Sequence, residues 1–438
     1  MNKYGARVFY AYFTENFMIS KDRYEYYVNV LRNELVPAMG CTEPIAIAYA
    51  AAKARATLGR FPTSCNIAVS GNIIKNAKSV VVPHTGGMRG IETAVIAGLV
   101  GGNADARLEV LSSVSEDDIA KMRKVKECLP ITVTLSDSDY PFDINLTLFA
   151  DNDEATVRIV NRHTNIVSIT KNGKRIYDAE IDDSVEDKVM DLSVEEIIEF
   201  SNTVDVSDVK DILKRQIDYN MAIAEEGLNN DWGANIGKVY MSCYANDVSV
   251  KAKAYAAAGS DARMNGCELP VIINSGSGNQ GMTASIPVVI YWQDLGLDEE
   301  KLYRALCVSN LLTIHVKRGI GTLSAYCGAV AAGAGAGSGI AYLHGGGYEE
   351  IAHTLVNSLA IDSGLICDGA KASCAAKIAT AVENGILGFN LYRMGNQFIG
   401  GDGIVKKGVE NTIDSVSRLA KDGMRDTDRE ILNIMLNA

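Results

Sequence analysis

Residues 322–343 read TLSAYCGAVAAGAGAGSGIAYL, a stretch that contains no charged side chain. The stretch is long enough for a membrane helix, but it is mostly Ala and Gly and has few large apolar side chains. Such residues gain little from lipid and allow helices to approach closely, so we predict a helix inside the protein core. We expect this helix to end in the glycine-rich run at 333–339, because glycine commonly terminates helices.

The composition around this stretch is that of a globular protein. The chain has 438 residues, 47% hydrophobic and 22% charged, a length that predicts two or three domains. A net charge of −12 would repel a phosphate backbone, so nucleic-acid binding is not expected. Residues 1–17 lack the continuous apolar region of a secretory signal. The nine cysteines show no disulfide spacing, so we expect reduced thiols and a cytoplasmic protein with no membrane contact.

Three segments differ in their hydrophobic pattern. We interpret 1–61 as N-terminal helices that pack on the C-terminal domain, 62–185 as an α/β domain, and 186–438 as a helical domain. The middle segment contains short runs rich in β-branched residues and an Asn172–Gly173 pair that predicts a hairpin. The expected strands are 66–70, 79–82, 108–111, 131–135, 145–149, 155–160 and 166–169. The predicted fold class is therefore α+β, a mostly helical domain with an inserted α/β sandwich domain.

Three cysteines lie close to glycine in surroundings with few charges. They are Cys41 in MGCTEP (39–44), Cys327 in LSAYCGA (323–329) and Cys367 in ICDGAK (366–371). Glycine lets the backbone approach a bulky cluster, and nearby amides can hydrogen-bond to its sulfur atoms, so the setting suits an iron–sulfur site. The alternative is that the thiols fill the core, as free cysteines commonly do. We expect that simpler role for Cys65, Cys128, Cys243 and Cys307.

A further thiol, Cys374, decides what such a cluster could do. It lies seven residues beyond Cys367, which is two turns on along a helix. As a fourth ligand it would close the cluster, whereas three ligands would leave one iron open. We favour a structural role for Cys374, in which its side chain faces the core of its helix and is not a ligand. Zinc is disfavoured because the chain has no closely spaced cysteine pair and no histidines at ligand spacing.

Two glycine-rich loops could bind a small ligand. His84, Thr85, Gly86 and Gly87 follow an apolar run and precede a predicted helix, an arrangement that suits a carboxylate or phosphate but also an ordinary tight turn. The second loop, 274–281, lacks the glycine spacing of a dinucleotide site. Because unpaired polar groups are costly to bury, we expect it to line a polar cavity rather than form a linker. Its candidate binding residues are Asn274, Ser275, Ser277, Asn279 and Gln280.

Candidate acid–base groups are few, because no catalytic triad, phosphate-binding lysine loop or carboxylate pair is recognisable. Lys371, close to Cys367, and Lys317 are possible acid–base groups, and Lys371 and His84 are the two that we would test first. A lone lysine near a helix end is more often a solvated charge that interacts with the helix dipole.

Four of these motifs together resemble the signatures of the L-cysteine desulfidase family, which is related to the iron–sulfur L-serine dehydratases. The motifs are residues 40–44, 274–281, 323–328 and 366–371, and the resemblance spans roughly 30–400. The resemblance implies a 4Fe–4S cluster held by Cys41, Cys327 and Cys367. It also implies that the loop at His84 binds a substrate carboxylate, although Pro83 stands where the dehydratases have serine.

The activity that this resemblance implies is α,β-elimination of L-cysteine to sulfide, pyruvate and ammonia. The two loops would hold the carboxylate and ammonium of this small amino-acid substrate, and Lys371 or His84 would be the base. Two alternatives remain, an L-serine dehydratase of the same fold and a non-catalytic iron–sulfur protein for redox sensing or sulfur storage. The Ala- and Gly-rich helices would also suit packing between the subunits of a homodimer.

Overall fold

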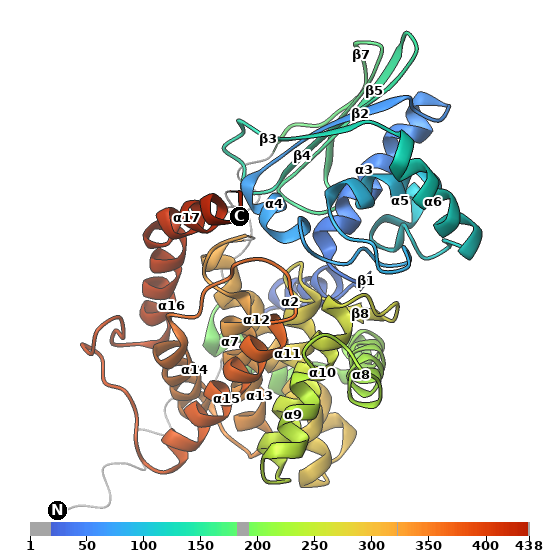
Figure 1. Cartoon of the computed structure of the whole chain (residues 1–438). Coiled ribbons are helices and arrows are strands. Elements are labelled where there is room, and N and C mark those ends of the chain that lie inside the picture. The colour runs from blue at the N-terminus through green and yellow to red at the C-terminus, as the bar shows by residue number, and fades with distance from the viewer. Residues whose placement is uncertain (1–18, 182–191, 322, 437–438) are drawn as a thin grey trace, which may run out of the picture.

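The computed structural model describes residues 19–181, 192–321 and 323–436. It has two lobes, one built on a β-sheet and one built of helices (Figure 1). The α+β fold class with a helical majority is therefore confirmed.

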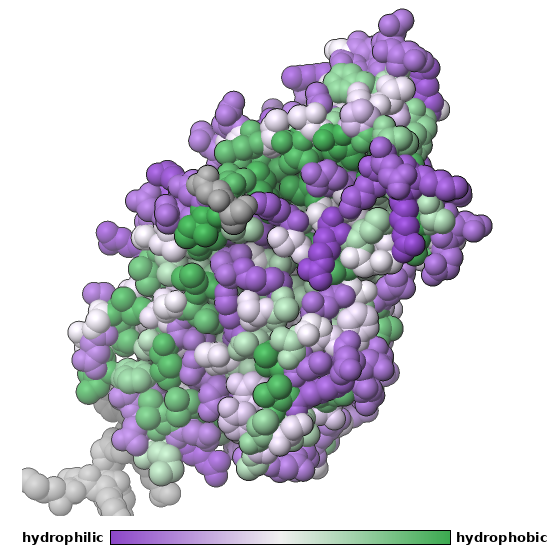
Figure 2. All heavy atoms as spheres, in the orientation of Figure 1, coloured by the Kyte–Doolittle hydropathy of each residue, from purple (hydrophilic) through white to green (hydrophobic). Residues whose placement is uncertain are grey.

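The sheet lobe contains six strands in the order β3-β2-β4-β5-β6-β7. Only the β2–β3 pair is parallel, and the other neighbours are antiparallel. The predicted hairpin turn lies between β6 and β7, where Asn172 and Gly173 have φ values of 53° and 73°, as a type I′ turn requires. Hydrophilic residues cover this end of the sheet (Figure 2). The strands are β2 (Ser64–Val69), β3 (Ile131–Leu135), β4 (Asp143–Ala150), β5 (Asp153–Val160), β6 (Ile166–Lys171) and β7 (Lys174–Asp178).

Helices cover one face of this sheet (Figure 1). They are α3 (Thr42–Leu58), α4 (Gly71–Ala77), α5 (Ile91–Val100) and α6 (Glu116–Cys128), with a short 3₁₀ helix at Ala104–Glu109. Two predicted strands are wrong: 108–111 overlaps the 3₁₀ helix, and 79–82 contributes only an isolated bridge from Val81 to Arg89. Both runs are short and apolar, and periodicity alone does not distinguish a strand from other buried backbone in such runs.

The structure differs from the predicted organisation of residues 1–61 in the position of α3. The earlier helix, α2 (Lys21–Glu34), packs in the core of the helical lobe, as expected. In contrast, α3 shares its core with the sheet. Nearly every α3 residue from Thr42 to Ala54 is buried, because the helix is apolar on all sides. A helix without a polar face carries no sequence signal for which lobe it joins.

The helical lobe holds the other helices. Among the described residues, none of the helices combines the length and apolarity needed to cross a membrane. The bounds are α7 (Val194–Thr203), α8 (Val206–Asn229), α9 (Ile236–Cys243), α10 (Val248–Met264), α11 (Gly278–Leu295), α12 (Glu299–Ile320), α13 (Gly328–Leu343), α14 (Tyr348–Asp362), α15 (Cys374–Arg393), α16 (Val409–Arg418) and α17 (Arg425–Leu436), with a π-helical turn at Leu419–Gly423.

The core helix predicted from 322–343 is α13, and it does not end in the glycine run. Its residues from Ala329 to Leu343 are all buried. A Cβ atom on Gly333 would lie 2.3 Å from the carbonyl oxygen of Ala381, and one on Gly337 would lie 2.4 Å from that of Gly385. The glycines therefore continue the helix, because they allow the backbones of α13 and α15 to touch.

Several contacts join the lobes, and two of them bear on the site. The short strands β1 (Pro37–Met39) and β8 (Pro270–Ile272) pair antiparallel, so the chain that enters α3 lies beside the loop at 274–277. At the other end of the junction, α17 returns to α4 of the sheet lobe (Figure 1). There Lys75 pairs with Asp428, and the Lys78 ammonium donates to the carbonyl of Met435 at 2.6 Å.

The close contact between α13 and α15 predicts that Gly337→Ala destabilises the protein. Alanine would normally favour a helix by about 1 kcal/mol over glycine. Here its Cβ must push two backbones apart, so we expect a net loss of about 1–3 kcal/mol in the free energy of unfolding, measured by denaturant titration. Gly364→Ala is the control, because a Cβ there meets no atom within 4 Å. Equal stability of Gly337→Ala and the wild type would contradict the packing.

Candidate active site

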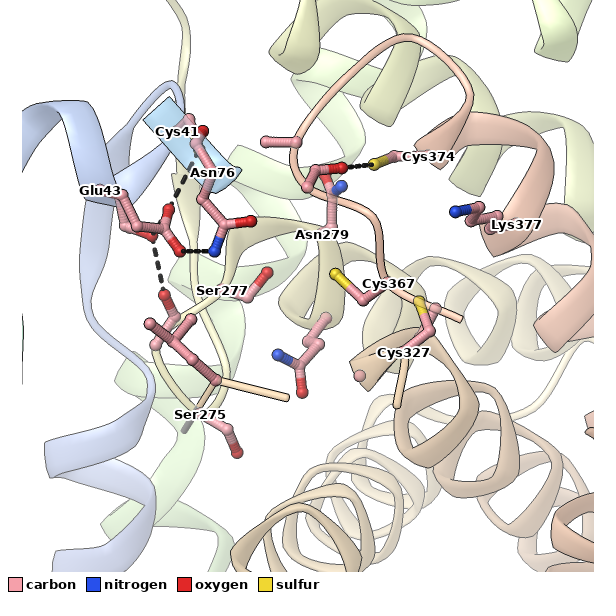
Figure 3. A pocket seen from close by; sticks show the side chains of 18 of the residues that line it. Cys41, Glu43, Asn76, Ser275, Ser277, Asn279, Cys327, Cys367, Cys374 and Lys377 are labelled. Atoms are coloured by element: carbon pink, nitrogen blue, oxygen red, sulfur yellow. Dashed lines mark hydrogen bonds between the residues drawn. The ribbon is translucent and has the colours of Figure 1, made fainter. Parts of the chain in front are cut away.

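A cavity of about 120 Å³ lies where the two lobes meet. The sheet lobe contributes α3, α4 and the β5–β6 connection, and the helical lobe contributes the rest (Figure 3). The polar and thiol side chains that line it are Cys41, Thr42, Glu43, Lys75, Asn76, His163, Arg263, Ser275, Ser277, Asn279, Gln280, Lys317, Ser324, Tyr326, Cys327, Cys367, Cys374 and Lys377.

A short backbone bridge brings Cys327 and Cys367 together, although they are far apart in the sequence. The Cys327 amide donates to the Leu365 carbonyl at 3.1 Å, and the Cys367 amide donates to the Ala325 carbonyl at 2.6 Å. Tyr326 and Ile366 form an antiparallel bridge between these two bonds. The two cysteines are therefore neighbours across paired backbone, and both line the cavity.

Cys374 joins this pair from the first turn of α15. Burial raises the pKa of Cys327 to about 12, and the neighbouring Cys367 and Cys374 thiols act in the same direction. Burial also raises the pKa of Cys374, again with a contribution from Cys367. These mutual effects reflect proximity, so Cys327, Cys367 and Cys374 form one group. We call these three residues the thiol cluster.

Cys41 lies across the cavity from the thiol cluster, beside Glu43 and Asn76 (Figure 3). It precedes α3 and follows Gly40, whose φ of 55° and close contact with Pro83 require glycine. The Cys41 thiol donates to Glu43 Oε2 at 3.1 Å. Burial and then the Glu43 charge raise its pKa well above the usual value. All four cysteines thus line one cavity, but among the described residues no three Cys, His, Asp or Glu side chains are grouped to hold a metal ion.

Four helices begin at this cavity. Cys41 and Cys327 are the N-cap residues of α3 and α13, Ser277 is the N-cap of α11, and Cys374 opens α15. None of the three N-cap side chains accepts a capping hydrogen bond from a backbone N–H of its own helix. Because helix N-termini carry unpaired N–H groups and partial positive charge, their convergence favours an anionic occupant.

Several buried polar atoms at the cavity have no hydrogen-bond partner among the described residues. They are Nε2 of His163, Nε of Arg263, Oε1 of Gln280 and Oη of Tyr326. Burial lowers the pKa of His163, so this ring is neutral near neutral pH. Since unpaired buried polar groups are costly, the set indicates a cavity shaped for a polar ligand.

The loop at 274–280 lies where the sequence predicted. Ser275, Ser277, Asn279 and Gln280 line the cavity. Asn274 does not; its side chain is fully buried and donates to the Asn310 carbonyl at 3.2 Å and to Asn310 Oδ1 at 3.0 Å. Asn274 therefore anchors the turn that presents the other four residues.

The structure does not bring the other predicted residues to the cavity. His84 Nδ1 lies 3.3 Å from Glu268 Oε2, and the Thr85 hydroxyl donates to the Val82 carbonyl at 2.7 Å. Gly86 and Gly87 have positive φ and complete this tight turn, which is also outside the cavity lining. Lys371 contacts Asp368 Oδ2 at 2.6 Å, and it too is outside the lining. Their assignment as substrate-binding or catalytic groups stays a prediction.

Sequence reasoning missed several lining residues, notably Glu43, His163, Arg263 and Lys377. Lys377 is half-buried and donates to the Ile366 carbonyl at 2.9 Å. Burial lowers its pKa, but the hydrogen bond to Asp368 and the nearby charges outweigh this effect and raise it. A signal existed for Glu43, which lies within the GCTEP motif, and for Lys377, one turn after Cys374. We find none for His163 or Arg263.

Comparison with known proteins agrees with this geometry. A family model described as "Serine dehydratase alpha chain" matches residues 105–433, about three quarters of the chain. The chain therefore belongs to the serine dehydratase alpha chain family. It is also 57% identical over 427 residues to a UPF0597 protein of Desulfitobacterium hafniense, covering 96% of this chain and 99% of that protein. A UPF0597 protein of Lachnoclostridium phytofermentans is 50% identical over 417 residues, covering 94% and 100%.

The buried thiols predict slow alkylation at the cavity. Cys128 and Cys243 are exposed, so the prediction that they fill the core is wrong. In protein stripped of metal under reducing conditions, these two thiols should react with iodoacetamide before Cys41 and Cys327. Because the thiolate is the nucleophile, the Cys327 rate should rise about tenfold per pH unit from about pH 7 to about pH 9 without levelling off. Residue-resolved mass spectrometry measures these rates. A Cys327 rate that equals that of Cys243, or that levels off in this range, would contradict the buried, protonated thiol.

Proposed function

We propose that this protein is an iron–sulfur-dependent lyase that catalyses α,β-elimination from a small amino acid, with L-cysteine as substrate and sulfide, pyruvate and ammonia as products. The observation that carries the proposal is the group of four thiols that line one polar cavity, three of them at helix N-termini. Membership of the serine dehydratase alpha chain family supports the reaction class.

The chemistry of the lining residues suits a 4Fe–4S cluster, although no three of the described side chains already converge on one point. Thiolates are the usual ligands of iron–sulfur clusters, and the amide groups of helix N-termini suit its sulfur atoms and negative charge. We propose that Cys327, Cys367 and Cys374 hold it, because the Tyr326–Ile366 bridge makes Cys327 and Cys367 neighbours and Cys374 lies on the same side of the cavity (Figure 3). The Cys41 thiol instead donates to Glu43. The resemblance described above implies Cys41 in the place of Cys374, and the two ligand sets are distinguished by experiment below.

When bound by three thiolates, such a cluster supplies an open iron that acts as a Lewis acid and stabilises negative charge on the leaving sulfide. The protein must also provide a group that takes the Cα proton. Cys41 and Glu43 are suited to that role, because a thiol and a carboxylate in hydrogen-bond contact can share a proton beside the substrate. His163 is a neutral ring close to Glu43 that could relay it.

L-Serine is the second candidate substrate, because the matching family model carries the name of a serine dehydratase. A hydroxyl leaving group would use the same cavity and the same proton-transfer pair. Turnover of the two amino acids under identical conditions decides between them.

The test begins with anaerobic purification and analysis of iron and sulfide. We expect about four iron atoms per chain, a brown protein, and sulfide release from L-cysteine that exceeds ammonia release from L-serine. Cys327→Ala, Cys367→Ala and Cys374→Ala should each lose both iron and activity. Cys41→Ala should retain the iron and lose the activity, because it removes one member of the proposed Cys41–Glu43 proton-transfer pair.

Cys243→Ala is the matched control, since Cys243 is exposed and outside the cavity. A colourless protein without iron that still releases sulfide would overturn the proposal. Loss of iron in Cys41→Ala with retention in Cys374→Ala would replace our ligand set with the one that the resemblance implies.

A further inference from the structure

Arg263 is a buried cation that has no charged partner. The residue is 3% exposed, and its Nη1 donates to the neutral Asn279 Oδ1 at 3.0 Å. Among the described residues, its Nε has no hydrogen-bond partner and no carboxylate forms an ion pair with the guanidinium. A buried charge without a counter-charge is costly, so this guanidinium requires an anion that the protein itself does not supply.

The position of the guanidinium strengthens this requirement. A Cβ on Gly278, the first residue of α11, would lie 2.4 Å from Arg263 Nε, so the guanidinium rests against the start of that helix. The N-terminus of α11 carries partial positive charge of its own. Two positive features adjoin one another at the cavity wall, and they would repel unless an anion lies between them.

Glu43 lines the same cavity and carries the opposite charge. Its carboxylate is 8% exposed and accepts from the Cys41 thiol at 3.1 Å, the Thr42 hydroxyl at 3.2 Å and the Asn76 amide at 3.0 Å. All three donors are uncharged. A carboxylate offers about four acceptor sites, so one remains for a cationic donor.

The lysines of the cavity do not neutralise Glu43, because each has another partner. Lys75 pairs with Asp428, Lys317 donates to the Gly321 carbonyl, and Lys377 donates to Asp368. Arg263 senses the Glu43 charge but does not contact it directly. A cation and an anion that line one small cavity without forming an ion pair are the complement of a zwitterion.

We propose that Arg263 and Glu43 bind the zwitterionic head of an α-amino acid, with the carboxylate held by Arg263 and the α11 N-terminus, and the ammonium held by Glu43. This inference rests on the proposed function only in placing the substrate in this cavity. The inference gives the recognition of an α-amino acid to Arg263 and Glu43. Neither residue belongs to the loops at 84–87 and 274–280 that the sequence predicted to bind substrate.

The test uses two thiols that each carry one of the two charges. 3-Mercaptopropionate lacks the ammonium and cysteamine lacks the carboxylate, so neither is an α-amino acid. Binding to anaerobically purified, cluster-loaded protein is measured by calorimetry. Arg263→Met should weaken 3-mercaptopropionate about 10–100-fold and leave cysteamine within about twofold. Glu43→Gln should weaken cysteamine about 10–100-fold and leave 3-mercaptopropionate within about twofold. Arg263→Lys should recover part of the 3-mercaptopropionate affinity.

Arg89→Met and Glu268→Gln are the charge-matched controls, because both side chains lie outside the cavity lining. Iron content and circular dichroism confirm that each variant is loaded and folded. If Arg263→Met fails to fold, Arg263→Lys and Glu43→Gln still give the crossed pattern. Equal effects on the two ligands, or none, would overturn the proposal. So would loss of iron in Arg263→Met and Arg263→Lys, because Arg263 would then serve the cluster.

Failure of this inference is distinguishable from failure of the proposed function. The crossed binding pattern without sulfide release would support the zwitterion site and overturn the lyase. Sulfide release without the crossed pattern would support the lyase and overturn the zwitterion site.

Discussion

The contact between α13 and α15 is the constraint on which the rest of the site depends. Gly333 faces Ala381 and Gly337 faces Gly385, so the two helices run parallel and their N-termini lie at the same end. Cys327 and Cys374 stand at those N-termini. Any larger side chain at these glycines would separate the backbones, and the distance between the two cysteines would change with it.

Both lobes contribute residues to the site, and the charged groups that they contribute differ. The helical lobe contributes the thiol cluster and Arg263, and the sheet lobe contributes Cys41, Glu43 and His163. Pairing of β1 with β8 and the return of α17 to α4 hold the two sides in register. Because neither lobe alone encloses the cavity, relative motion of the lobes would alter the spacing between the proposed carboxylate and ammonium sites.

Much of the candidate site could be predicted, for reasons that particular residues make clear. Cys41, Cys327 and Cys367 stand near glycine, and the 274–280 loop combines polar side chains with apolar flanks, so each carries a local signal. Arg263 has none, because a buried arginine in an Ala-rich helix looks like any surface arginine in sequence. The loop at 84–87 has a local signal but lies outside the cavity lining. A glycine-rich turn before a helix predicts an anion site whether or not the turn faces a cavity.

The sequence by itself determined the α+β class, the β6–β7 hairpin and the burial of the 322–343 helix, because turn chemistry and apolar composition act over a few residues. Only the tertiary structure decided that the glycine run continues α13, that α3 belongs to the sheet lobe, and that Cys374 joins Cys327 and Cys367 while Cys41 faces them. The physical reason is that these outcomes depend on which backbones touch. Glycine permits such contact at many positions in the chain, and packing selects among them.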